Sequence, residues 1–164
     1  MKITDEPVFT TFNEEESKTQ VIKQNICIAV GIQNSRTKLR VSVLLNTIPE
    51  YHVREIASKC EIGEIIDESD LIIGAGFAAR EGVLRRKPVI VIGDHGFGGL
   101  ITPDTLRIQY NNDFRGKIHG LKDEYFSLET LEREIRKGFE LTYHELQMMS
   151  NQTLTFLRYA DFLI

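Results

Sequence analysis

The chain has 164 residues, a formal net charge of -4 at pH 7 and 41% hydrophobic residues. This length and composition predict one soluble globular domain with room for a hydrophobic core. The mild negative charge argues against a nucleic-acid partner, because nucleic-acid binders usually carry a basic excess. No apolar run reaches the roughly 20 residues that a membrane-spanning helix needs, and the N-terminus lacks the apolar core of a signal peptide. We therefore expect a cytoplasmic protein without a transmembrane segment.

Residues 1–24 are polar and acid-rich. We expect them to form a polar N-terminal lead-in to a single α/β domain over residues 25–164. Cys27 and Cys60 lie in apolar segments without CxxC spacing, and the histidines are scattered along the chain. The two cysteines are therefore expected to be buried free thiols, and no metal site is predicted.

The first predicted element is a strand over residues 25–32. This run is apolar on both faces, which is typical of a buried parallel strand. Residues 39–45 begin by alternating in polarity and predict a second strand, although a helix over residues 35–48 stays open. Pro49 then precedes apolar residues at helical spacing, which predicts a helix that begins near it. The apolar positions of that helix are Val53, Ile56, Ala57 and Cys60.

A strand–glycine turn–helix–strand unit occupies residues 70–94. Residues 71–73 and 88–92 predict short buried strands, and residues 77–86 predict the helix between them. The turn before the helix is Gly74-Ala75-Gly76. Such a unit is typical of parallel α/β folds that bind nucleotides.

The rest of the chain predicts three further segments. Residues 93–99 are dense in glycine and predict a loop, and residues 106–110 predict one more strand. Ser127 is placed to cap a long helix whose apolar side runs from Leu128 to Met149. Alternating strands and helices predict a Rossmann-like α/β domain, in which an open, mostly parallel sheet carries helices on both faces.

The two glycine-rich segments follow two predicted strands, at the edge where open α/β sheets bind ligands. Gly74 and Gly76 let the backbone approach a ligand closely, and the helix after them points free N–H groups and the positive end of its dipole at it. This arrangement is typical of an anion or diphosphate site. The alternative is that the glycines only form tight turns. His95, in the second segment, is a candidate phosphate donor or acid–base group, or else is simply exposed.

Glu81 is a candidate acceptor for the two hydroxyls of a ribose, because one carboxylate accepts from both. From spacing alone, an i,i+4 ion pair with Arg85 is the favoured interpretation. No arrangement of serine, cysteine and histidine residues predicts an activated nucleophile, so the catalytic residues stay unassigned.

Three segments carry a resemblance to a known family. Residues 70–91 read DLIIGAGFAAREGVLRRKPVIV, residues 96–104 read GFGGLITPD, and residues 112–116 read NDFRG. In this order they resemble the C-terminal, donor-binding lobe of GT-B glycosyltransferases, in particular the glycosyltransferase 1/4-like group of bacterial sugar transferases. The resemblance implies one GT-B-like lobe that binds a nucleotide-sugar in surface polysaccharide biosynthesis, with no cofactor besides that donor.

The resemblance also implies roles for individual residues. In that family the glycine turn lies at the diphosphate, and the glutamate that matches Glu81 takes the ribose. The glycine-rich loop around His95 would close over the diphosphate or the sugar. Carried over residue by residue, the donor would contact Gly74, Gly76, Phe77, Ala78, Glu81, His95, Gly96, Gly98, Gly99 and Thr102.

The chain also departs from the family pattern. The family's arginine after the glycine turn is Phe77 here, its leucine before the glutamate is Arg80, and its acidic residue eight positions earlier is Ile73. A complete GT-B enzyme has a second lobe for the acceptor, for which this chain is too short. We therefore expect a subunit or lone lobe that works with a partner transferase subunit or as a homo-oligomer. The alternative is a catalytically inactive interaction or regulatory protein on the same fold.

A second alternative is an NAD- or FAD-binding Rossmann protein. Gly74 to Ala79 fits the pattern G-x-G-x-x-A, and Asp94 follows about 20 residues after Gly74, where an acidic ribose ligand is expected. The glycine-rich segment after Asp94 has no role in that scheme, so this interpretation ranks below the first.

Overall fold

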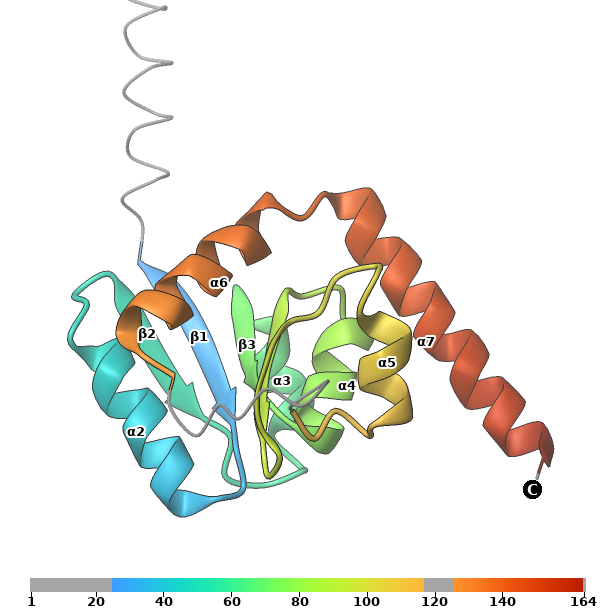
Figure 1. The fold of residues 1–164 in the computed structure, drawn as a ribbon, viewed down its shortest axis with the longest axis horizontal. Coiled ribbons are helices and arrows are strands. Elements are labelled where there is room, and N and C mark those ends of the chain that lie inside the picture. The colour runs from blue at the N-terminus through green and yellow to red at the C-terminus, as the bar shows by residue number, and fades with distance from the viewer. Residues whose placement is uncertain (1–24, 117–125, 164) are drawn as a thin grey trace, which may run out of the picture.

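The computed structural model describes residues 25–116 and 126–163 (Figure 1). Its centre is a five-stranded sheet in the order β2-β1-β3-β4-β5. The first four strands are mutually parallel, and β5 runs antiparallel to β4. The predicted Rossmann-like α/β fold is confirmed, while the lead-in predicted for residues 1–24 lies outside the described residues. The strands are β1 (Ile26–Gly31), β2 (Tyr51–Glu55), β3 (Leu71–Gly74), β4 (Val89–Gly93) and β5 (Gly96–Leu100).

Helices cover both faces of the sheet, as Figure 1 shows. Two pack on one face, α2 (Ser35–Asn46) and α6 (Leu128–Glu140), and the others pack on the opposite face. Successive residues of one strand therefore enter different cores: Ile28 packs with α2 and α6, and Ala29 packs with the helices of the other face. Both cores exclude water, which explains why the central strands are apolar throughout. The helices of the second face are α3 (Ile62–Asp67), α4 (Gly76–Leu84), α5 (Leu106–Asn111) and α7 (Tyr143–Leu163).

The strand predicted for residues 39–45 is wrong, and the helical alternative holds. Asn34 caps α2, because its side-chain oxygen accepts a hydrogen bond from the Thr37 N–H at 3.1 Å. Val41 and Leu45 are fully buried one turn apart, so the same apolar residues satisfy both a strand pattern and a helix pattern. The helix predicted after Pro49 is also wrong, because residues 51–55 pair with β1 as strand β2. Hydrogen bonding of residues 51–55 to β1 therefore outweighs the helical spacing of the apolar residues in this segment.

Two predictions fail beyond β4. The glycine-dense segment is not an open loop, because Gly96–Leu100 forms strand β5 and pairs with β4 in a hairpin. Residues 106–110 form helix α5 rather than a strand. Thr102 and Thr105 initiate that helix, since the Thr102 N–H donates to the Thr105 hydroxyl at 2.8 Å.

The long C-terminal helix is two helices. Ser127 caps α6 as predicted, accepting a hydrogen bond from the Thr130 N–H at 3.2 Å. The chain then becomes extended at Leu141, and α7 begins with a capping box in which Thr142 and Glu145 exchange hydrogen bonds. Figure 1 shows α7 running along the outer side of the molecule, beyond α4 and α5. Within the described part of the chain, no helix is both long and apolar enough to cross a membrane.

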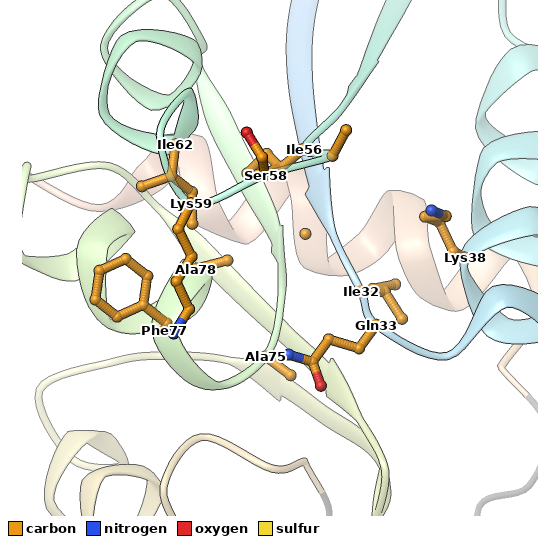
Figure 2. Close-up of a pocket in the computed structure, with 12 residues that line it drawn as sticks. Ile32, Gln33, Lys38, Ile56, Ser58, Lys59, Ile62, Ala75, Phe77 and Ala78 are labelled. Carbon is orange, nitrogen blue, oxygen red and sulfur yellow. The ribbon is translucent and has the colours of Figure 1, made fainter.

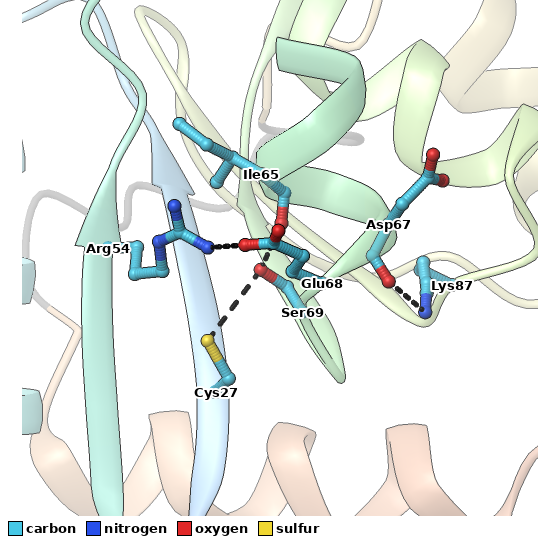
Figure 3. Close-up of polar contacts among 7 residues, drawn as sticks. All are labelled: Cys27, Arg54, Ile65, Asp67, Glu68, Ser69 and Lys87. Atoms are coloured by element: carbon cyan, nitrogen blue, oxygen red, sulfur yellow. Dashed lines mark hydrogen bonds and ion pairs between the residues drawn. The ribbon is translucent and has the colours of Figure 1, made fainter. Parts of the chain in front are cut away.

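The sheet edge where the parallel strands begin is held by polar contacts (Figure 3). The Cys27 N–H donates to the Asp70 carboxylate at 2.8 Å, and the Cys27 Sγ lies 3.8 Å from the Ser69 Oγ. Ser69 is 1% exposed and donates to the Ile65 carbonyl oxygen at 2.5 Å, so it is a structural residue. Both cysteines are free, as predicted, but neither is fully buried, because Cys27 is partly exposed and Cys60 is exposed.

Candidate functional site

The strand order places a crevice between β1 and β3. In the sheet, β2 lies on one side of β1 and β3 lies on the other. The connection after β1 leads toward β2 and the connection after β3 leads toward β4, so the two connections leave in opposite directions. At such a switch point the loops diverge beyond the carboxyl ends of the strands, and ligands of doubly wound folds bind there. The strands end at Gly31 and Gly74, which are register partners.

A cavity of about 290 Å³ opens at this point (Figure 2). It lies between the β1–α2 connection, the β2–α3 connection and the start of α4. Figure 2 shows Gln33 beside Ala75 and Lys59 beside Phe77. Lys38 and Lys59 are its charged lining residues, and the described lining holds no carboxylate. The cavity is therefore electropositive and suited to an anion.

The N-terminus of α4 adds to this positive character. Ala75 is the N-cap residue and has no side chain that caps the helix. The Gly76 N–H donates to the Phe114 carbonyl oxygen at 3.0 Å, and the next two amides of the first turn belong to Phe77 and Ala78, which line the cavity. Uncapped amides and the positive end of the helix dipole attract an anion at this point.

A second hollow of about 350 Å³ adjoins the first along the same edge. The two share Ile32, Gln33 and Ala75, and the second extends to Gly93 and Arg115. Asp94 and Asp113 also line it, so its charge is mixed where that of the first cavity is positive. The carboxyl edge of the sheet is thus one extended groove with a cationic end and an end of mixed charge.

The structure brings together most of the predicted site residues. Gly74 ends β3, Gly76 begins α4, and Phe77 and Ala78 line the cationic cavity. His95 lies in the turn between β4 and β5, and Gly96 begins β5 opposite Gly93, at the same edge of the sheet. The His95 N–H donates to the Arg115 carbonyl oxygen at 3.0 Å, which fixes this turn against the segment after α5.

Four predicted residues do not join this group: Gly98, Gly99, Thr102 and Glu81. β5 runs back from the carboxyl edge, so Gly99 lies beside Val91 in the middle of β4. The Gly98 carbonyl oxygen accepts a hydrogen bond from Gln109 at 3.1 Å, which joins β5 to α5. Thr102 lies beyond the far end of β5 and belongs to the start of α5.

Glu81 forms the ion pair that its spacing predicts. Its carboxylate lies 3.6 Å from the Arg85 guanidinium, which also holds Asp67 at 2.6 Å. The hydrogen bond that Arg85 donates to the Asp67 carboxylate is the main cause that raises the pKa of Arg85. Glu81 lines neither of the two hollows described above. A ribose contact from Glu81 would therefore compete with its contact to Arg85.

Sequence reasoning missed several residues of the cationic cavity. Gln33 lies in the β1–α2 connection and Lys38 near the start of α2, where the sequence predicts a buried strand before them but no binding segment. Ser58 and Lys59 lie in the β2–α3 connection, which was assigned to a helix. The sole signal that could indicate a binding role for these residues is that their segments follow strands, where open α/β sheets bind ligands.

The described residues contain no group of three or more histidine, cysteine, aspartate or glutamate side chains placed to hold a metal ion.

Comparisons with models of protein families, with curated proteins and with solved structures find no match for this chain.

Proposed function

We propose that this domain binds a nucleotide-sugar as a glycosyltransferase-like subunit or lone lobe, with the diphosphate in the cationic cavity. The observation that carries the proposal is the cavity itself, at the switch point between β1 and β3, with Lys38, Lys59 and the uncapped start of α4 around it. A diphosphate matches two ammonium groups and a helix N-terminus in charge. The resemblance of residues 70–116 to a donor-binding lobe supports the same ligand.

The proposal assigns each group a binding role. The ammonium groups of Lys38 and Lys59 neutralise the phosphate oxygens, and the first-turn amides of Phe77 and Ala78 donate hydrogen bonds to them. Ser58 and Gln33 offer side-chain hydrogen bonds to the polar parts of the ligand. Chemistry at the sugar would need an acceptor and a base from a partner subunit.

Isothermal calorimetry with UDP-, GDP- and dTDP-sugars tests this function. We expect the sugars of one nucleotide (UDP, GDP or dTDP) to bind. Lys59→Gln should weaken that binding by about tenfold, the low end of the about 1.5–3 kcal/mol of a hydrogen bond to a charged group, because Lys59 is exposed. Lys137→Gln is the matched control, because Lys137 is an exposed cation on α6, on the opposite face of the sheet. Absence of binding for the whole panel at millimolar ligand would overturn the proposal. Binding of NAD or FAD instead would favour the dinucleotide alternative.

A second candidate function is an interaction protein on the same fold. Leu39 and Val43, one turn apart on α2, are 63% and 56% exposed, which is unusual for large apolar side chains on one helix face. Co-purification with a transferase subunit that Leu39→Lys abolishes would favour this candidate. A full-rate transferase reaction by the isolated chain would exclude it.

A further inference from the structure

A third hollow of about 150 Å³ lies on the α5 side of the α4 N-terminus. It is lined by Gly76, Phe77, Arg80, Tyr110, Asp113 and Phe114. Its volume is below the roughly 300–1,000 Å³ of pockets for drug-sized ligands, so it suits one ring or one small polar group. Gly76 also lines the mixed-charge hollow, and Phe77 also lines the cationic cavity. The third hollow therefore adjoins both parts of the groove at the start of α4.

Arg80 is the unusual residue of this hollow. Its Nε is buried and has no hydrogen-bond partner among the described residues. Its guanidinium lies 5.1 Å from the centre of the Phe77 ring, but that ring also faces the Lys59 ammonium at 5.3 Å. No carboxylate of the described residues forms an ion pair with Arg80. A partly buried cation in this state gains from an oxyanion that brings its own acceptors.

The other lining residues narrow the chemistry of the ligand. Asp113 is an exposed carboxylate at the rim, which accepts hydrogen bonds from hydroxyl groups. Its negative charge disfavours a ligand group with more than the one negative charge that Arg80 neutralises. Phe77 and Tyr110 offer aromatic surface for the apolar face of a ring. The hollow thus combines a planar cation, a hydroxyl acceptor and aromatic walls. A sugar that carries one carboxylate and several hydroxyls matches all three.

We propose that this hollow is a subsite for an acidic sugar, in which Arg80 binds the sugar carboxylate and Asp113 accepts from a sugar hydroxyl. For the nucleotide-linked form of the sugar this inference rests on the proposed function, whereas recognition of the acidic sugar by Arg80 does not. A guanidinium holds a carboxylate through two parallel hydrogen bonds, so Arg80 is the specificity-determining residue.

A matched pair of ligands tests the selectivity. UDP-glucuronic acid and UDP-glucose differ in the oxidation state of one carbon, as do GDP-mannuronic acid and GDP-mannose. We expect calorimetry to show about tenfold tighter binding of the acidic member, the effect of one charge-assisted contact. Arg80→Gln removes this preference and leaves the neutral member unchanged. Arg133→Gln, an exposed arginine on α6, keeps the preference.

A second measurement does not need the nucleotide. The buried Nε–H of Arg80 is expected to give a resolved NMR signal, assigned by its loss in Arg80→Gln. Glucuronate shifts this signal and glucose does not. If nucleotide-sugars bind without preference for the acidic member and glucuronate leaves the signal unchanged, the subsite is wrong and the nucleotide site stands. If glucuronate shifts the signal while no nucleotide-sugar binds, the subsite stands and the proposed function is wrong. If neither measurement responds, both are wrong.

Discussion

Gly74 and Gly31 meet backbone to backbone at the carboxyl ends of β3 and β1. A Cβ on Gly74 would stand 2.8 Å from the Gly31 carbonyl oxygen, closer than such atoms approach in proteins. The strands must come this close because Ala75 continues the contact, donating its N–H to the same oxygen at 3.2 Å. Packing therefore explains Gly74 without a ligand, and it is the cavity beside Gly74 that indicates a ligand.

The Gly74→Ala substitution is expected to lower the free energy of unfolding by about 1–3 kcal/mol, the range for forcing an extra methyl into a packed site. The methyl meets backbone atoms, which cannot rotate away. Urea denaturation followed by circular dichroism measures the change. A loss below the error of the midpoint would contradict the close approach of β1 and β3.

Gly76 is required for a different reason. Its φ is +57°, and a Cβ at this position would meet nothing within 4 Å. Gly76→Ala is expected to cost about 1–2 kcal/mol because the left-handed conformation strains an L-residue, and Gly76→Asn is expected to cost less. Denaturation midpoints of the two variants should therefore rank Asn above Ala. Equal losses would point to crowding instead of conformation.

A segment of this chain is predictable when its apolar residues fit either the strand period or the helix period, but not both. Residues 70–94 were predicted correctly because two short, continuously apolar runs flank a glycine turn and a segment of mixed apolar and charged residues. The runs fit only buried strands, and the mixed segment fits a helix. Residues 39–45 were ambiguous because Val41 and Leu45 are two steps of a strand face and also one turn of a helix apart. β2 could not be predicted from its own residues, since pairing with the buried β1 decides its conformation.

The site was predictable in part for the same reason. The edge at Gly74 and Gly76 follows from the strand–turn–helix unit. Lys59 could not be assigned to the site, because its place depends on β2 being a strand. Gly99 and Thr102 were assigned to the edge because a glycine-dense segment looks like a loop, whereas the hairpin turns it into a strand that leads away.

The cap of α6 was read directly from the sequence and makes a sharp prediction. Ser127→Ala removes the acceptor for the Thr130 N–H and is expected to lower the free energy of unfolding by about 1 kcal/mol. Ser127→Asn, which keeps a capping oxygen, serves as the control and should cost much less. Thermal and urea denaturation of the three proteins give the comparison. A Ser127→Ala protein as stable as the unchanged chain would show that the cap is not needed.

The cationic cavity predicts a strong dependence of ligand binding on charge. Lys38 comes from α2 and Lys59 from the β2–α3 connection, so the Lys38→Gln/Lys59→Gln double variant is expected to lose more than the roughly tenfold of a single variant. Binding of a nucleoside diphosphate by the unchanged protein should also weaken as salt is raised, because these groups are partly exposed to solvent. Calorimetry at low and high ionic strength measures both effects. If the double variant keeps full affinity, the diphosphate does not occupy this cavity.

Tyr51 predicts how stability changes at high pH. Burial raises the pKa of this phenol, and the negative charge of Glu132 raises it further, with Arg136 opposing. The folded chain therefore holds the Tyr51 proton when the unfolded chain has begun to lose it, at about pH 10. Since the folded state binds more protons, stability must fall as pH rises from that value up to the raised pKa.

Tyr51→Phe removes this contribution, so its free energy of unfolding should fall less steeply above about pH 10 than that of the unchanged protein. Glu132→Gln removes the second cause and should bring the Tyr51 titration closer to that of an ordinary tyrosine. Urea denaturation at neutral and alkaline pH, with phenolate absorbance to follow the titration, checks both variants. Parallel alkaline slopes for Tyr51→Phe and the unchanged chain would show that Tyr51 ionises equally in both states. In that event the contact between the start of β2 and α6 does not exclude water as the structure indicates.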